Sequence, residues 1–297
     1  MSNCFDINVL SSSHINFLFG AGVNGKAFPQ LKSFTDTLSK IEELGGNIEN
    51  GFESGIDSLS SNAHKKIVKD VFIKEFMEAD AKMNEKFGKD MSLINLEKML
   101  RKTYLLVNES QNRNPSMKQI NIFTLNYDQI VEKTLSGLGY FFSEISASNT
   151  TTRAMLLDVI GYNFNVKKYV PTFMVSKLHG DIDNPIIPGK SKYQEMLNED
   201  YFEIAFNMKE KLCRQNSILI VIGYSGRDEH INKILKDCLN AGLTIYWYKF
   251  AQMDIVPFEE NTQIIVRQQE NYSNPQDTTA NCYRDMEQVW EKKLELC

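Results

Sequence analysis

The sequence predicts an α/β protein whose core is a doubly wound, mainly parallel, Rossmann-like sheet with an inserted helical subdomain. Three observations indicate this fold class. Short apolar segments recur without strict alternation, which is typical of strands covered on both faces. Helical patterns follow at least three of these segments after short turns, as in repeated strand–turn–helix units. A long, charged, helix-patterned stretch separates the first two segments and contains no strand signal.

Seven segments have the length and the β-branched or aromatic composition of strands. The first, second and fifth are almost wholly apolar, as expected for the central strands of a buried sheet. The last segment, 263–267, has the weakest strand signal. The expected strands are residues 15–19, 120–124, 140–143, 173–178, 217–223, 244–250 and 263–267.

Helices are expected where start and stop signals frame an amphipathic pattern. The segment 29–44 has proline in its first turn and ends before two glycines, which favours a helix between them. Residues 45–62 are polar and rich in Gly, Ser and Asn, so we expect a loop there. The other expected helices are 128–138, 228–239 and a C-terminal amphipathic segment, 286–296.

The 297 residues suit one α/β domain with insertions. Residues 63–112 are charged and helix-patterned, and we predict a helical insert there. A smaller, polar helical insert is expected at 184–215. The whole chain, 1–297, is then a single domain that carries both inserts.

Charge and hydropathy exclude several classes of protein. The net charge of −5 argues against direct nucleic-acid binding by bulk charge. The longest apolar run, 217–223, is far shorter than the roughly 20 residues that a membrane helix needs. The N-terminal residues lack a basic segment followed by an apolar core, so we expect a cytoplasmic protein without a signal peptide.

The cysteines predict neither a metal site nor a disulfide framework. Their number is odd, and no pair has the spacing of a zinc knuckle. We expect reduced thiols used as small apolar residues. They are Cys4, Cys213, Cys238, Cys282 and Cys297.

The first apolar segment ends in a glycine loop. Gly20, Gly22 and Gly25 have the G-x-G-x-x-G spacing, which lets a pyrophosphate approach a helix N-terminus. A tight turn without a ligand is the alternative. A dehydrogenase would need a second strand ending in an acid about 20 residues further on. Here Glu42 and Glu43 lie within a helical pattern and no strand follows, so hydride transfer is disfavoured.

Three more predicted strands end in polar clusters: residues 124–128 (TLNYD), 177–181 (KLHGD) and 222–228 (IGYSGRD). Each cluster alone fits a turn or a helix cap. Together they predict one site, because ligands bind outside the carboxyl ends of parallel strands. His179 is the one histidine of four at such a strand end, whereas His230 lies in a first helical turn and is expected to face solvent.

Taken in order, G-A-G at 20–22, T-x-N-Y-D at 124–128, L-H-G-D at 178–181 and G-Y-S-x-R-D at 223–228 resemble the sirtuin-like superfamily. More narrowly, they are similar to the sirtuin-like (silent-information-regulator-like) domains of bacterial antiphage defence systems, which hydrolyse NAD⁺. The resemblance covers about residues 15–239.

The chain departs from the protein-deacylase sirtuins at three points. It cannot build their four-cysteine zinc module, so no zinc is expected. It has G-K-A-F-P-Q at 25–30 in place of G-I-P-D-F-R, and Leu125 in place of the Gln that precedes the Asn. Deacylation is therefore disfavoured, while cleavage of the NAD⁺ glycosidic bond remains compatible with the motifs.

The resemblance implies an NAD⁺ glycohydrolase that releases nicotinamide and ADP-ribose and depletes NAD⁺ in abortive infection. Asn126 would position water or a ribose hydroxyl, and His179 would be the general base, since an ordinary histidine pKa of roughly 6.5 suits that task. Asp128 would either contact the nicotinamide carboxamide or cap a helix. The remaining binding residues would be Gly20, Ala21 and Gly22 at the pyrophosphate, and Gly223, Ser225 and Asp228 on the adenosine side.

Two other kinds of function stay open. One is a non-enzymatic NAD⁺ or ADP-ribose sensor or scaffold subunit, and the other is an ADP-ribosyl transferase or deacylase. Because uncontrolled NAD⁺ destruction would harm the cell, we expect activity to be gated by homo-oligomerisation or by a partner. The resemblance suggests a ring-forming HerA-type ATPase as that partner.

Overall fold

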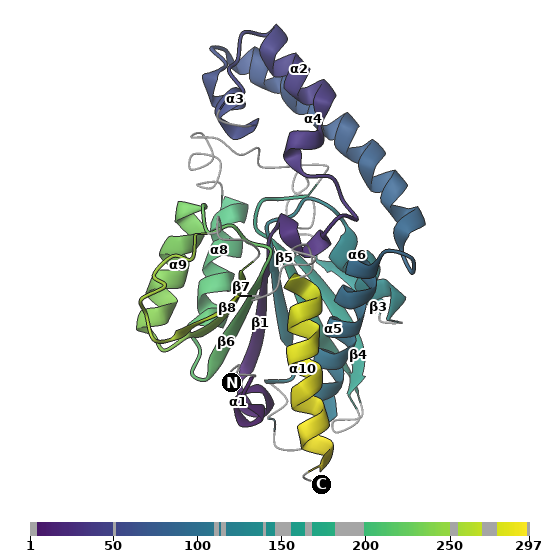
Figure 1. Cartoon of the computed structure of the whole chain (residues 1–297), viewed down its shortest axis with the longest axis vertical. Coiled ribbons are helices and arrows are strands. Elements are labelled where there is room, and N and C mark those ends of the chain that lie inside the picture. The colour runs from purple at the N-terminus through teal and green to yellow at the C-terminus, as the bar shows by residue number, and fades with distance from the viewer. Residues whose placement is uncertain are drawn as a thin grey trace.

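The computed structural model describes residues 5–49, 52–109, 113, 117–138, 141–145, 156–163, 168–181, 199–249, 255–268 and 278–295. Its centre is an eight-stranded sheet in the order β3-β4-β5-β2-β1-β6-β7-β8. The six strands from β5 to β8 in this order are parallel. β3 and β4 add an antiparallel edge. This arrangement confirms the predicted doubly wound, mainly parallel α/β class (Figure 1).

All seven predicted strands are present. β5 begins five residues before its predicted start, the other six differ by at most two residues at their ends, and β4 is an additional strand. β4 pairs with both β3 and β5 and carries a register shift between Val159 and Ile160. The strands are β1 His14–Phe19, β2 Ile120–Thr124, β3 Phe141–Ile145, β4 Leu156–Asn163, β5 Lys168–Lys177, β6 Ser217–Ile222, β7 Thr244–Lys249 and β8 Ile264–Gln268.

The α-helices are α1 Ile7–Ser12, α2 Thr35–Glu43, α3 Phe52–Ser58, α4 Asn62–Met83, α5 Met91–Glu109, α6 Ile130–Gly137, α8 Glu199–Leu212, α9 Glu229–Asn240 and α10 Thr278–Glu295. Short 3₁₀ helices are η1 Ala21–Asn24, η2 Leu31–Ser33 and η3 Asn84–Lys86. None of the described helices is both long enough and apolar enough to cross a membrane.

Three helix predictions need correction, and the first is the C-terminal helix, which begins at Thr278 and not at residue 286. The segment 29–44 is a 3₁₀ turn followed by α2, because the side chain of Phe34 between them is buried in the core. The expected loop 45–62 contains α3, whose Phe52 and Ile56 lie one helical turn apart and are both buried. Residues 184–198 of the smaller expected insert lie outside the described residues.

Helices cover both faces of the sheet. Along β6, Ile218 and Ile220 belong to one buried cluster and Leu219 and Val221 to another, because successive strand residues point to opposite faces. The first cluster includes side chains of α5 and α10, which pack against each other. The second includes side chains of α8 and α9. Figure 1 shows these two helix layers on either side of the sheet.

The stretch 63–112 holds two long helices that lie in different places. α4 packs against α2, away from the sheet, whereas α5 runs beside α10 (Figure 1). An ion pair of 2.7 Å between Lys133 of α6 and Asp80 of α4 ties α4 to the sheet-covering helices. The division of the chain into one domain with inserts at 63–112 and 184–215 stays a prediction.

Four parallel strands end at one level. Phe19 of β1 is in register with Thr124 of β2 and with Ile222 of β6, and Thr124 is in register with Lys177 of β5. The chain passes from β1 to β2 on one side and returns to β6 on the other side of β1. The turns that carry the four motifs therefore meet at a topological switch point, where ligands bind in open α/β sheets.

Candidate functional site

A cavity of about 380 Å³ lies where these four turns meet. Its volume falls within the roughly 300–1,000 Å³ of small-molecule sites. All nine residues that the sequence predicts for binding or catalysis line this cavity. They are Gly20, Ala21, Gly22, Asn126, Asp128, His179, Gly223, Ser225 and Asp228.

The two glycine loops, after β1 and after β6, pack backbone against backbone. The N–H of Gly20 donates to the carbonyl of Ile222 at 3.0 Å, and that of Gly22 donates to the carbonyl of Gly223 at 3.1 Å. A Cβ on Gly20 would lie 2.4 Å from the Gly223 oxygen. Gly223 itself has φ of 68°, which disfavours a side chain. These glycines are therefore required by loop packing, whether or not a ligand binds.

The first loop differs from the predicted anion site in one respect. It leads into the 3₁₀ helix η1 and not directly into an α-helix. Since the N–H groups of Gly20 and Gly22 already donate to the second loop, a pyrophosphate at this turn needs other donors.

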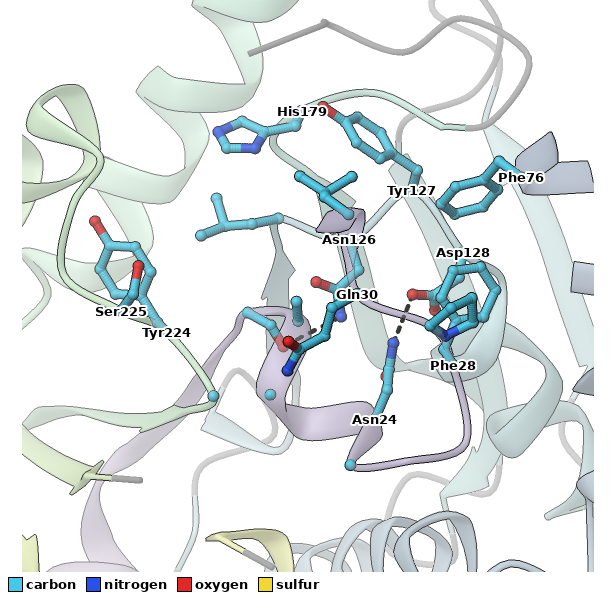
Figure 2. Close-up of a pocket in the computed structure, with 18 of the residues that line it drawn as sticks. Asn24, Phe28, Gln30, Phe76, Asn126, Tyr127, Asp128, His179, Tyr224 and Ser225 are labelled. Atoms are coloured by element: carbon cyan, nitrogen blue, oxygen red, sulfur yellow. Dashed lines mark hydrogen bonds between the residues drawn. The ribbon is translucent and has the colours of Figure 1, made fainter. Parts of the chain in front are cut away.

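Asn126 connects β2 to the first glycine loop. Its side chain is buried, and its Nδ2 donates to the carbonyl of Gly20 at 3.2 Å. Its backbone N–H donates to Thr124 Oγ1 at 3.1 Å. Figure 2 shows the Asn126 amide between the His179 ring and the Asp128 carboxyl. The fold thus fixes this amide in the middle of the cavity wall.

Asp128 accepts a hydrogen bond at the start of α6 and also lines the cavity. Its Oδ1 accepts the N–H of Ile130 at 3.1 Å, in the first turn of α6. Its Oδ2 accepts from Asn24 Nδ2 at 2.6 Å (Figure 2). Burial raises the pKa of Asp128 to about 6, although nearby Lys177 and the Ile130 N–H act in the opposite direction. Both forms of this carboxyl are therefore accessible near neutral pH.

A buried ammonium group holds the Asn126–Asp128 turn in place. Lys177 Nζ, at the end of β5, donates to the carbonyls of Asp128 at 2.7 Å and Tyr127 at 3.2 Å. It also lies 2.7 Å from Glu132 Oε1 of α6. This network joins the end of β5 to the turn after β2.

His179 is buried in the turn after β5 and has two titratable neighbours. Its Nε2 lies 3.3 Å from His230 Nε2 and 3.8 Å from Asp228 Oδ1. The expectation that His230 faces solvent is therefore wrong, because the start of α9 turns this half-buried ring toward the cavity wall. The Asp228 carboxylate likewise lies beside His179.

Tyr224 orders the loop that carries Asp228. Its hydroxyl accepts the backbone N–H of Asp228 at 3.1 Å and lies 3.0 Å from Asn232 Oδ1. Asn232 Nδ2 in turn donates to the carbonyl of Gly226 at 2.8 Å. The beginning of α9 is thus bonded to the glycine turn before it, which fixes the positions of Asp228 and His230.

Aromatic rings close the end of the cavity nearest Asp128 (Figure 2). Phe76 of α4 lies 4.7 Å from Phe28, 5.8 Å from Phe34 and 6.0 Å from Tyr127, measured between ring centroids. The cavity therefore has an apolar aromatic end beside a buried carboxyl, and a polar end at His179 and Asp228.

Sequence reasoning did not identify several residues of the site, among them Asn24, Phe76, Lys177 and His230. Asn24 and Lys177 lie within or beside the quoted motifs. Their position as polar residues next to the ends of buried strands was the signal that could have identified them. Phe76 reaches the cavity from α4, and nothing in the local pattern indicates that contact.

A sequence model of the family described as "SIR2-like domain" matches residues 120–273. This is more than half of the chain, and the chain therefore belongs to the SIR2-like family. Members of this family are generally NAD⁺-dependent enzymes, and the sirtuin-like resemblance is confirmed.

Among solved structures, the chain is similar to one described as "Structural Basis for the Mechanism and Regulation of Sir2 Enzymes". The identity is 12%, the TM-score is 0.43, and the match covers 96% of this chain and 97% of that one. No curated protein sequence matches the chain.

Proposed function

We propose that the chain is an NAD⁺ glycohydrolase that cleaves NAD⁺ to nicotinamide and ADP-ribose. One observation carries this proposal. Asn126 and His179, from turns after two different strands, line a single cavity at the switch point of a SIR2-like domain. A protein that only binds NAD⁺ does not require a potential base, His179, in the same cavity as the fixed amide of Asn126.

The chemistry requires little acid catalysis. Nicotinamide leaves as a neutral ring from a cationic one, so the leaving group needs no proton. The ribose develops oxocarbenium character, as in other glycosidic cleavages. The site must then hold the ribose and activate water. Asn126 would orient the water or a ribose hydroxyl, and His179 would accept the proton.

The two ends of the cavity suggest how NAD⁺ would lie. The aromatic end beside Asp128 suits the nicotinamide ring, and the Asp128 carboxyl, when protonated, can donate to its carboxamide oxygen. Gly20, Ala21 and Gly22 would let the pyrophosphate approach closely. Gly223 and Ser225 would face the adenosine. Asp228 lies 3.8 Å from His179, so a place beside the base suits it better than the predicted adenosine contact.

We further propose that this reaction depletes NAD⁺ in the cytoplasm during antiphage defence, as abortive infection. The support is the resemblance of the four motifs to such domains. Homo-oligomerisation or a partner, with a HerA-type ATPase as the first candidate, would gate the activity. Because Phe34 and Phe76 of the α2–α4 region line the cavity, a contact on these helices could reach it.

Product analysis tests the proposed reaction. The purified chain, alone and with its genomic neighbour, is incubated with NAD⁺, and nicotinamide, ADP-ribose and cyclic products are quantified. We expect equal amounts of nicotinamide and ADP-ribose. Nicotinamide without free ADP-ribose would favour a transferase. Bound but uncleaved NAD⁺ in every condition would contradict the proposal and favour a sensor or scaffold.

A further inference from the structure

Three side chains of the types that ligate metal ions meet at the polar end of the cavity. His179 follows β5, whereas Asp228 and His230 lie at the start of α9. The Nε2 atoms of the two histidines are 3.3 Å apart, and one ligand atom from each of the three residues lies within 4.8 Å of the others. His179 and Asp228 also line the cavity, so a group bound between the three would be exposed to it.

The spacing of the two imidazoles suits a shared metal ion. Zinc–nitrogen bonds of about 2.0–2.1 Å at the tetrahedral angle place two ligand nitrogens roughly 3.3–3.4 Å apart. The separation of 3.3 Å agrees with this value. Without a metal ion, the same two nitrogens form a hydrogen bond whose direction depends on the tautomers of the rings. The Asp228 carboxylate, at 3.8 Å from His179, completes the set after a small side-chain movement.

The donor set and its support also fit a metal. Two imidazole nitrogens and one carboxylate oxygen are ligands of zinc sites that keep a fourth position open to water. His179 is buried in its turn, and Tyr224 bonds to the backbone of Asp228 at the start of α9. Ligands held on such ordered segments lose little freedom when an ion binds.

We propose that His179, Asp228 and His230 bind one divalent transition-metal ion of the zinc type, with its open position directed into the cavity. The expectation that the chain binds no metal rested on its cysteines, and the fold brings together a different set of donors. The ion would occupy the Nε2 lone pair of His179. It would therefore inhibit NAD⁺ cleavage, a consequence that rests on the proposed function, whereas the binding itself does not.

Metal titration of the full chain tests the site. After chelator treatment, Zn²⁺ binding is measured by calorimetry, and Co²⁺ binding by its visible absorption. The matched variants are His230→Gln, which removes one proposed ligand, and Cys213→Ser. The latter alters a pair of thiols, Cys213 and Cys238, whose Sγ atoms lie 2.9 Å apart, and so controls for binding of the ion by sulfur. Circular dichroism and thermal melting verify that each variant is folded.

We expect one Zn²⁺ per chain in the wild type and in Cys213→Ser. Folded His230→Gln should bind at least about 100-fold more weakly, since even the loss of an outer-shell partner costs 10–100-fold. The Co²⁺ spectrum should show tetrahedral nitrogen and oxygen ligation without a sulfur charge-transfer band. Equal affinity in His230→Gln, or loss of binding only in Cys213→Ser, would overturn the proposal.

Inhibition is measured separately from binding. Zn²⁺ should slow nicotinamide release by the wild type, and a chelator should restore it. One bound Zn²⁺ with unchanged release would contradict the inhibitory role. A chain that binds Zn²⁺ through these residues but never cleaves NAD⁺ would refute the proposed function and leave the metal site standing.

Discussion

At the scale of single residues, Asp128 lies in an unusual environment. Its carboxyl group is buried, accepts hydrogen bonds from the Ile130 N–H and from Asn24, and has a pKa that burial raises to about 6. In the unfolded chain the pKa of an aspartate is roughly 3.9. Between these two values the folded protein keeps a proton that the unfolded chain has released. Asp128 therefore destabilises the fold as pH rises from about 4 to 6.

We predict that Asp128→Asn removes this pH dependence. In the wild type the contribution of Asp128 to the free energy of unfolding should fall by up to about 1.4 kcal/mol per pH unit across this window, roughly 3 kcal/mol in all. Urea unfolding of both proteins from pH 4 to 7 measures the difference.

Asp237→Asn is the matched control, because Lys209 lowers the pKa of the exposed Asp237. Its contribution has the opposite sign and is lost as the pH falls. Parallel pH profiles of wild type and Asp128→Asn would show that Asp128 titrates normally.

The polar site residues were predictable because they directly follow strands that the apolar pattern reveals. Asn126, Asp128 and His179 belong to this group. His230 was not, because its orientation depends on how α9 begins, and that depends on a hydrogen bond of the Tyr224 hydroxyl that residue spacing does not indicate. Lys177 belongs to a strand, and its buried partner Glu132 lies on α6, so their pairing exists only after folding.

At the scale of elements, a buried ion pair joins β5 to α6. The side chains of Lys177 and Glu132 are 3% and 14% exposed. We predict that Lys177→Met destabilises the protein by about 3–5 kcal/mol, because it leaves Glu132 and two carbonyls without the ammonium group. Chemical denaturation measures this loss, and Lys177→Met with Glu132→Leu should recover part of it.

Lys209→Met serves as the comparison, since Lys209 and Asp237 form an exposed pair between α8 and α9. This variant should have little effect on stability. Equal effects of the two lysine substitutions would refute the structural role of the buried pair.

The contact between the two glycine loops is also testable at this scale. A methyl group on Gly20 would meet the Gly223 oxygen at 2.4 Å, whereas one on Gly137 of α6 has no neighbour within 4 Å. We predict that Gly20→Ala costs about 1–3 kcal/mol of stability, as overpacking does, and weakens NAD⁺ binding. Gly137→Ala should be neutral or stabilising, because alanine favours helices. Thermal melting measures the stability of both variants, and NAD⁺ titration measures their affinity.

The sequence predicted the central elements better than the peripheral ones. Fully buried strands such as β1, β2 and β6 are apolar runs with turn residues at their ends, and this pattern is visible in the sequence. β4 is missed because its pairing with β3 and β5 determines it, and its own sequence includes Asp158 and Gly161. α3 is missed because polar and small residues surround Phe52 and Ile56, whose burial depends on contacts with α2 and α4.

At the scale of the whole molecule, α4 couples the region away from the sheet to the cavity. Phe76 lies on α4 and lines the cavity, and Asp80 one turn later pairs with α6. If assembly gates the reaction, specific activity should rise with chain concentration or on addition of the partner. Light scattering and nicotinamide release across one concentration series test this. Constant activity per chain in every assembly state would contradict gating.

The most direct test of the central claim separates NAD⁺ binding from NAD⁺ cleavage in the assembled protein. We predict that Asn126→Asp and His179→Ala lower the rate of nicotinamide release by at least about 100-fold, as loss of a positioned base does. Both variants should remain folded and still bind NAD⁺, and Asn126→Asp should melt at a lower temperature, because it replaces the buried Nδ2 group that donates to the Gly20 carbonyl. His64→Ala, on α4 away from the cavity lining, should release nicotinamide normally. Wild-type release by folded His179→Ala would contradict the account.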